Sequence, residues 1–205
     1  YNTPDNSMES LEKAIEHGDA SFEIDVRQRP NGTIVMSNDI INTNSDGTEI
    51  TAAFQRAKET DMHLNLNIKE TRVLKNLHDL IVDYSLTDRV TLTGIEVFQA
   101  NKVKENCPGV EYYINYMPSR INIFTEDYQQ KIIDMLEKTG AIGINCNYKY
   151  ASRTLSNLLH KNGYKLSIWT VDRKYQIKRA LVNTADNITT HNPQKVQHII
   201  NKWGK

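Results

Sequence analysis

The stretch Phe22-Glu23-Ile24-Asp25-Val26 alternates large apolar side chains with two carboxylates. Such alternation is typical of a β-strand, in which successive side chains point to opposite faces. We therefore expect the three apolar side chains on one face and both acids together on the other. Two carboxylates this close repel each other unless a cation or a cationic side chain lies between them. The stretch thus predicts a strand that carries a charged site.

A second stretch repeats this pattern. From position 62 to 68 every even residue is apolar and every odd residue is polar, and Lys69 follows directly. This alternation predicts a second strand with one polar face, which could line the same site as the first. An amphipathic strand at the edge of a sheet would show the same alternation, so that alternative stays open.

Length and charge restrict the classes of protein to consider. The chain has 205 residues, enough for a substantial core, and we expect a single domain over 1–205. Its 25 basic and 25 acidic residues balance, so we expect no nucleic-acid partner. No apolar run approaches the ~18–20 residues that cross a bilayer, so we expect no transmembrane segment. Cys107 and Cys146 are expected as free thiols, which favours a cytoplasmic location and leaves a secreted or periplasmic one open.

Strand-like and helix-like segments alternate along the rest of the chain, which predicts a parallel α/β fold. The extended run 33–37 lies too close to strand 21–26 for a parallel crossover, so we expect it to fold back as a hairpin arm. A first helix is expected to open near Met8, with Asn6 as its cap, and to end at Gly18. Further helices are expected at 49–60, 71–84, 97–106, 125–138, 152–162, 174–183 and 193–203. Strands are expected at 21–26, 62–68, 89–94, 110–115, 141–145, 165–171 and 187–190.

The number of these strands suggests a barrel. A closed (β/α)8 or TIM barrel has eight strands, with its active site at their carboxyl ends. We count seven, and the chain begins with a loop and a helix, so the first strand would precede Tyr1. The alternative is an open barrel, which would expose core side chains and unpaired strand edges. We therefore favour a TIM barrel whose first strand is missing before Tyr1.

Several short motifs occur in a fixed order along nearly the whole chain. They are Pro4-Asp5-Asn6-Ser7, Glu23-Ile24-Asp25-Val26, Asn31-Gly32, Ser37-Asn38-Asp39, Asn67-Ile68-Lys69 and Ile168-Trp169-Thr170-Val171. In this combination the chain resembles the glycerophosphodiester phosphodiesterase family. The family pattern runs Pro-Glu-Asn-Thr/Ser, Glu-x-Asp-Val, a glycine turn, His-Asp, Glu-x-Lys and Trp-Thr-Val, and its opening His-Arg-Gly would lie before Tyr1.

The resemblance implies a TIM barrel of phospholipase C-like type that hydrolyses small glycerophosphodiesters to an alcohol and glycerol 3-phosphate. It also implies Ca2+ or Mg2+ as cofactor, with Glu23, Asp25 and Asn67 at the metal-ligand positions and Lys69 against the substrate phosphate. Hard oxygen ligands suit both cations. The alternative for the two acids is a structural ion-pair network with Lys69 and Arg27.

Two positions depart from the family pattern. Asn38 stands where the family has its second catalytic histidine, and asparagine exchanges no proton at neutral pH. Alternatively, Asn38 is a turn residue, or its amide binds a ligand. Asn67 replaces an acidic ligand, and its carbonyl oxygen can still coordinate a metal but adds no charge. The usual insertion after Asp39 is short, which predicts an open site. His191, after the last predicted strand, is the histidine that could substitute as proton carrier.

These features leave three functions open. The first is a metal-assisted phosphoric diester hydrolase, with Lys69 and Trp169 binding the substrate. The second is a catalytically impaired barrel that binds a phosphorylated ligand or a partner. The third, a barrel enzyme of another metal-dependent chemistry, fits the ordered motifs less well. In each case Trp169 either lines the pocket or belongs to the core.

Overall fold

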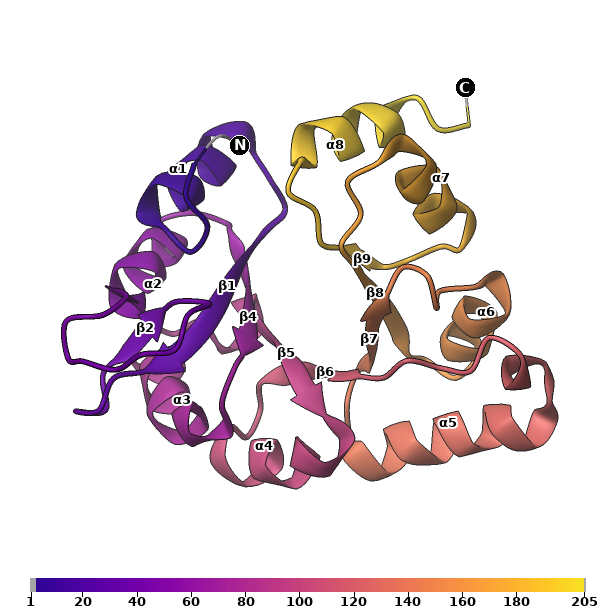
Figure 1. Ribbon diagram of the computed structural model, residues 1–205, viewed down its shortest axis with the longest axis horizontal. Helices are drawn as coiled ribbons and strands as arrows, with labels where there is room; N and C mark the ends of the chain where they lie inside the picture. Colours follow the sequence, from indigo (N-terminus) through magenta and orange to yellow (C-terminus); the bar gives the residue numbers. More distant parts are fainter. Residues whose placement is uncertain (1–2, 205) are drawn as a thin grey trace. The chain divides into compact units, whose positions relative to one another are not determined.

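The computed structural model describes residues 3–204. The chain divides into two compact units, Tyr1–Tyr112 and Tyr113–Lys205, which we call unit 1 and unit 2. Helices and strands alternate through both units, as the sequence predicted (Figure 1). The expected single domain over 1–205 stays a prediction.

Unit 1 is built around a mixed sheet with the strand order β3-β2-β1-β4-β5. Strands β1, β4 and β5 are parallel, and β2 and β3 are antiparallel additions at the edge. The predicted hairpin arm is confirmed as β2, whereas the two-residue β3 was not predicted. The elements are α1 (Met8–His17), β1 (Ser21–Gln28), β2 (Ile34–Met36), β3 (Thr48–Glu49), α2 (Ile50–Lys58), β4 (His63–Ile68), η1 (Thr71–Val73), α3 (Leu74–Asp83), η2 (Thr87–Arg89), β5 (Val90–Glu96), η3 (Val97–Gln99) and α4 (Ala100–Asn106).

Unit 2 contains four strands in the order β6-β7-β8-β9, all of them parallel. Each strand is followed by a helix, so the unit repeats a strand–helix module. The elements are β6 (Glu111–Asn115), which begins at the end of unit 1, η4 (Asn122–Phe124), α5 (Glu126–Thr139), β7 (Gly143–Asn147), α6 (Arg153–Lys161), β8 (Lys165–Trp169), α7 (Lys174–Val182), β9 (Asn187–Ile188) and α8 (Pro193–Asn201).

The ends of α1 show how local chemistry sets the element boundaries. Ser7, and not Asn6 as predicted, caps the helix, because its hydroxyl accepts a hydrogen bond from the Ser10 N–H at 3.2 Å. Asn6 has a φ of 53° and its side chain contacts Asp25 instead. Gly18 ends the helix as predicted, in the left-handed conformation that favours glycine.

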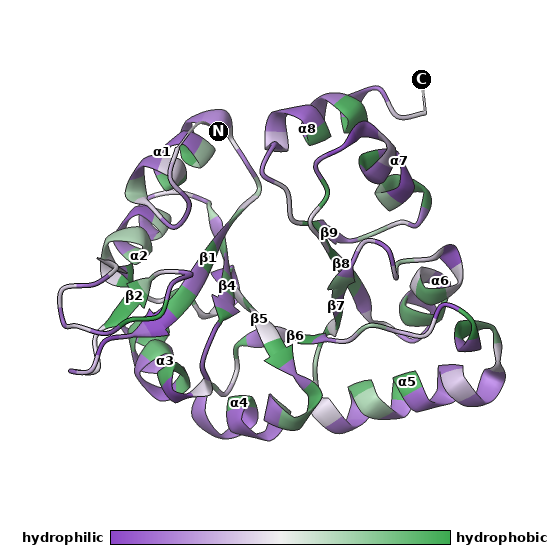
Figure 2. Ribbon diagram, viewed as in Figure 1, coloured by the Kyte–Doolittle hydropathy of each residue, from purple (hydrophilic) through white to green (hydrophobic). Residues whose placement is uncertain are grey.

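The predicted two-faced character of β1 is confirmed. Ile24 and Val26 are fully buried on one face, while Glu23 and Asp25 on the other face are partly exposed. The short strand β2 beside it is hydrophobic throughout (Figure 2). Burial of the apolar face therefore fixes the direction in which the two carboxylates point.

Both cysteines are buried free thiols, as predicted. Burial raises the pKa of Cys107 and of Cys146 to about 12, so both stay protonated at neutral pH. Within residues 3–204, the helices are all too short or too polar to cross a membrane. The cellular compartment stays a prediction.

Candidate functional site

The candidate site in unit 1 lies on the polar face of two neighbouring parallel strands. Strands β1 and β4 pair so that Glu23 is level with Asn65 and Asp25 is level with Asn67. The Asn65 amide donates to Glu23 Oε2 at 3.0 Å, and the Asn67 amide donates to Asp25 Oδ1 at 2.9 Å. The two polar patterns of the sequence therefore meet side by side, as predicted (Figure 1).

Asp25 is the centre of this cluster. The Lys69 ammonium lies 2.9 Å from Asp25 Oδ1, the oxygen that also accepts from Asn67. The Asn6 side-chain amide donates from Nδ2 to Asp25 Oδ2 at 3.0 Å, and its Oδ1 accepts from the Asp25 backbone N–H at 2.7 Å. Since the side chains of Asp25 and Lys69 are only 17% and 23% exposed, these contacts replace most of the hydration that the charges lose.

The ion-pair network that the sequence left open is present, with one difference. Lys69 forms the predicted pair with Asp25. Arg27, the other proposed cation, instead donates from Nε to the backbone oxygen of Asn38 at 3.1 Å. The lysine is thus held against the carboxylate, and the arginine holds the loop that follows β2.

Glu23 anchors the inner end of the cluster. Its partner Asn65 is buried and accepts a hydrogen bond from the Thr93 hydroxyl on β5 at 3.0 Å. These side-chain hydrogen bonds join three neighbouring strands, and the buried Asn65 orients the Glu23 carboxylate. The sequence motifs indicated Glu23 but not Asn65 or Thr93, although Asn65 is one of the odd polar positions of the second strand.

The orientation of Asn67 is fixed by both neighbouring strands. Its amide nitrogen faces Asp25, and its oxygen lies so close to β5 that a Cβ added to Gly94 would be 2.4 Å away from it. Gly94, with a φ of 75°, therefore provides the space for this side chain.

Asn38 lies at the margin of the cluster. It is exposed in the loop after β2, and its neighbour Ser37 donates its N–H to the Asp25 carbonyl oxygen at 2.9 Å. The loop is therefore attached to the backbone of the central carboxylate. The catalytic position assigned to Asn38 stays a prediction.

The donor set agrees only in part with the divalent cation expected from the resemblance. Carboxylate oxygens of Glu23 and Asp25 and the amide oxygen of Asn67 are the hard ligands that Ca2+ and Mg2+ prefer. As arranged, however, Asn67 turns its N–H toward Asp25, and Lys69 already supplies positive charge. Within residues 3–204, histidine, cysteine and acidic side chains form no group of three or more suited to a metal. A cation would have to displace the lysine and turn the amide.

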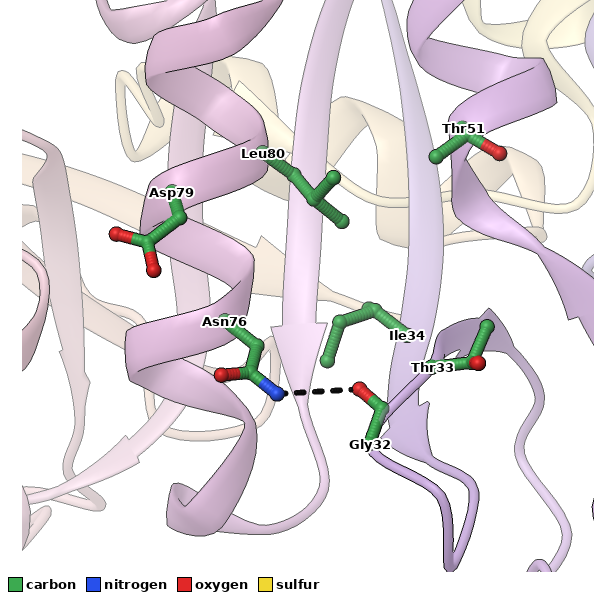
Figure 3. A pocket seen from close by; sticks show the side chains of 7 residues that line it. All are labelled: Gly32, Thr33, Ile34, Thr51, Asn76, Asp79 and Leu80. Atoms are coloured by element: carbon green, nitrogen blue, oxygen red, sulfur yellow. Dashed lines mark hydrogen bonds between the residues drawn. The ribbon is translucent and has the colours of Figure 1, made fainter.

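A cavity of about 290 Å³ lies elsewhere in unit 1, between the turn that follows β1 and the helices α2 and α3 (Figure 3). Asn76 on α3 closes one side by donating to the Gly32 carbonyl oxygen at 3.1 Å. The residues that line the cavity are Gly32, Thr33, Ile34, Thr51, Asn76, Asp79 and Leu80. None of the predicted site side chains lines it, so it is separate from the β1–β4 cluster.

In unit 2 a second group of candidate site side chains lies at the carboxyl ends of the strands. Trp169 is the last residue of β8, is partly exposed, and is level with Asn147 on β7. Its backbone oxygen accepts from the Tyr148 N–H at 2.9 Å. Trp169 is thus at a strand end, the position predicted for a pocket residue, and its substrate-binding role stays a prediction.

Asp172 and His191 form a pair just beyond β8 and β9. The Asp172 carboxylate contacts His191 Nδ1 at 2.9 Å and accepts the His191 backbone N–H, also at 2.9 Å. The Thr190 hydroxyl donates to the same carboxylate at 3.0 Å. A carboxylate that holds one imidazole nitrogen fixes the orientation of the ring. The sequence pattern indicated His191 but not Asp172, although Asp172 follows the Trp169-Thr170-Val171 motif directly.

The surroundings of Asp172 change its acidity. Partial burial alone would raise the pKa of its carboxyl group, but hydrogen bonds from His191 and Thr190 outweigh burial and lower that pKa below its usual value. The carboxylate is therefore kept ionised at neutral pH beside the imidazole.

No family model matches the chain. A curated glycerophosphodiester phosphodiesterase from Caldanaerobacter subterraneus subsp. tengcongensis is 22% identical over 239 residues, which cover 99% of this chain and 95% of that protein. The solved structure of a glycerophosphodiester phosphodiesterase from Parabacteroides distasonis has a TM-score of 0.81 and 19% identity, covering 98% of this chain and 91% of that one. An Oleispira antarctica phosphodiesterase in complex with the product sn-glycerol-3-phosphate has a TM-score of 0.74 and 16% identity, covering 96% and 91%.

These comparisons confirm the resemblance to the glycerophosphodiester phosphodiesterase family that the ordered motifs indicated. They also show the fold class, which is the α/β, TIM-barrel type of these structures. The degenerate catalytic pattern at Asn38 and Asn67 stays a prediction.

We predict that the Asp25–Lys69 contact contributes measurably to stability. A double-mutant cycle of Asp25→Asn and Lys69→Met is expected to give a coupling free energy of about 1–3 kcal/mol, because the pair is mostly buried and hydrogen-bonded. Urea denaturation of the four proteins measures it. The exposed Glu9–Lys13 pair is the control, with an expected coupling below about 0.5 kcal/mol. Equal coupling for the two pairs would contradict the central role of Asp25.

We also predict a pH-dependent contribution from Asp172. Because its pKa is lower in the folded state, the carboxylate stabilises the fold above its unfolded pKa of about 3.9. This contribution is lost as the pH falls through the folded pKa. Relative to wild type, Asp172→Asn should be less stable near about pH 7, by under about 1 kcal/mol because the pair is half-exposed, and the difference should shrink near about pH 3. Urea midpoints at both pH values test this, and a difference that grows in acid would refute it.

Proposed function

We propose that this protein is a phosphoric diester hydrolase of glycerophosphodiester phosphodiesterase type, which releases an alcohol and glycerol 3-phosphate from a small glycerophosphodiester. The observation that carries the proposal is the cluster of Glu23, Asp25, Asn67 and Lys69 on two parallel strands. These residues belong to motifs that resemble the family in sequence order. The likeness to a curated glycerophosphodiester phosphodiesterase over 99% of the chain supports the same reaction class.

Lys69 is the proposed phosphate contact. It follows β4, so it lies at the strand end where barrel enzymes bind their substrates. Asp25 holds its ammonium 2.9 Å away, which restricts the lysine side chain before a substrate arrives. A positioned ammonium stabilises the charge that develops on phosphoryl oxygens in the transition state.

A second candidate function is a barrel that binds a phosphorylated ligand without turning it over. The observation in its favour is Asn38, an amide at the position where the family has a histidine. Removing one proton-transfer group typically costs about 10²–10⁴ in rate. In this second candidate the cluster binds phosphate but does not catalyse hydrolysis.

One assay separates the two candidates. The chain is given glycerophosphocholine or glycerophosphoethanolamine with Ca2+ or Mg2+, and release of glycerol 3-phosphate is followed. We expect turnover by the wild type. Lys69→Met should lower kcat/KM by about 10²–10³-fold, because the negative charge that develops on the phosphoryl oxygens loses its counter-ion. Lys75→Met, an exposed lysine on α3, is the matched control and should leave turnover unchanged. Binding of glycerol 3-phosphate without turnover, together with turnover gained by Asn38→His, would establish the second candidate instead.

The Ca2+ or Mg2+ expected from the resemblance belongs to the proposal as well. Glu23, Asp25 and Asn67 would supply its oxygen ligands, and a bound cation would offset negative charge on the phosphate. Because Lys69 and the Asn67 amide already engage Asp25, we expect weak binding, with a Kd of about 10⁻⁴–10⁻³ M.

The isosteric change Asn67→Asp tests this expectation. It removes the hydrogen bond to Asp25 and sets two carboxylates against each other, so the metal-free variant should be less stable by about 1–3 kcal/mol. Added Ca2+ should restore its stability and bind more tightly than to wild type, because the site gains a charge. Thermal unfolding and calorimetric titration measure both effects independently of turnover. If Ca2+ leaves both the variant and wild type unchanged, the cluster is not a metal site.

A further inference from the structure

Three successive strand–helix connections of unit 2 expose the same kind of residue pair. Each connection follows the carboxyl end of a strand, and each places a basic residue directly before a large apolar or aromatic one. The pairs are Arg120-Ile121 in the loop after β6, Lys149-Tyr150 in the loop after β7 and Lys174-Tyr175 at the start of α7, after β8. All six residues are exposed. We refer to these three places as the loop ends, and their repetition distinguishes them from scattered exposed apolar residues, which are normal on proteins.

The first of these loops carries the largest apolar tips. Ile121 is 81% exposed and Phe124 is 69% exposed, in the segment between β6 and α5. Such exposure of two large apolar side chains to water is unfavourable, because burial of their apolar area would lower the free energy. The tips are therefore suited to an apolar environment outside the chain.

The loop is held in a defined conformation rather than left free. The Tyr128 hydroxyl on α5 accepts the Ser119 N–H at 2.8 Å and contacts the Tyr116 hydroxyl at 2.9 Å. Ile123, between the two exposed tips, is 2% exposed and anchors the segment in the core. The fold thus presents Ile121 and Phe124 on a fixed support.

Charge accompanies the apolar tips. Besides the three basic residues of the pairs, Arg173 is exposed on the loop after β8. Asp172 on the same loop is engaged by His191, whereas Glu126 and Asp127 are exposed at the start of α5, directly after this segment. The four basic residues outnumber these two exposed acids, so the loop ends combine apolar and net positive character.

We propose that these loop ends of unit 2 dock on a lipid surface that contains anionic headgroups. Ile121 and Phe124 enter the acyl boundary, the tyrosines lie at headgroup level, and the basic residues contact anionic headgroups. Separate tips on neighbouring loops suit a soft lipid layer, whereas a second protein chain would favour a continuous apolar patch. This inference does not depend on the proposed hydrolase activity.

Vesicle sedimentation of the whole chain tests the proposal. Phosphatidylcholine vesicles with and without phosphatidylserine serve as probes, and unfolding temperatures confirm that each variant is folded. We expect binding to the phosphatidylserine vesicles, and the double variant Ile121→Ser, Phe124→Ser should weaken it by at least about tenfold. Val182→Ser is the matched control, because Val182 is 55% exposed at the end of α7, away from these loops in sequence, and it should bind as wild type does.

The basic residues are tested separately. Arg120→Gln, Lys149→Gln and Lys174→Gln should each weaken binding to the phosphatidylserine vesicles by about fivefold at low salt, and should have little effect on binding without the anionic lipid. Absence of sedimentation with either vesicle would overturn the proposal, as would unchanged binding by the double variant. A concentration-dependent dimer that the double variant abolishes would assign the surface to contacts between copies. Turnover of water-soluble glycerophosphocholine should be the same in the double variant and wild type, so failure of hydrolysis and failure of docking are distinguished.

Discussion

The cluster in unit 1 depends on one physical constraint, the need to compensate a partly buried carboxylate. The Asp25 carboxylate is held by Asn6 from the segment before α1, by Asn67 on β4 and by Lys69 directly after β4. Burying a charge without such partners would cost more than a typical side-chain contact contributes. Two separate segments therefore converge on this strand because a single charge requires donors from both of them, and the Ser37 N–H attaches a third segment to the Asp25 backbone oxygen.

The sequence predicted the elements better than the contacts between them. The alternation around Glu23 and around Asn65 identified β1 and β4, because a strand with one buried face must repeat every second residue. Connection length alone predicted that β2 folds back. By contrast, Asn6 was assigned to the helix cap and Arg27 to the acids, since several residues compete for each partner and only spatial proximity decides between them.

The same limit applies to the candidate site. Ordered motifs brought Glu23, Asp25, Asn67 and Lys69 together correctly, because parallel strands align their ends. Thr93 and Asp172 were not predicted. Thr93 contacts Asn65, a neighbour that is distant in sequence, and Asp172 contacts His191 on another loop. Residues that act by orienting another side chain carry no recognisable pattern of their own.

Asn67 links the charge of the cluster to its chemistry. With an amide at this position, the Asp25 carboxylate pairs with the Lys69 ammonium, and the amide N–H supplies a further donor to Asp25. An acid at 67 would set a second carboxylate against Asp25, and their repulsion would favour binding of a divalent cation. The amide therefore compensates the Asp25 charge without a metal. Under the proposed function, Lys69 would therefore contribute more to phosphate binding here than it would beside a site with three acidic metal ligands.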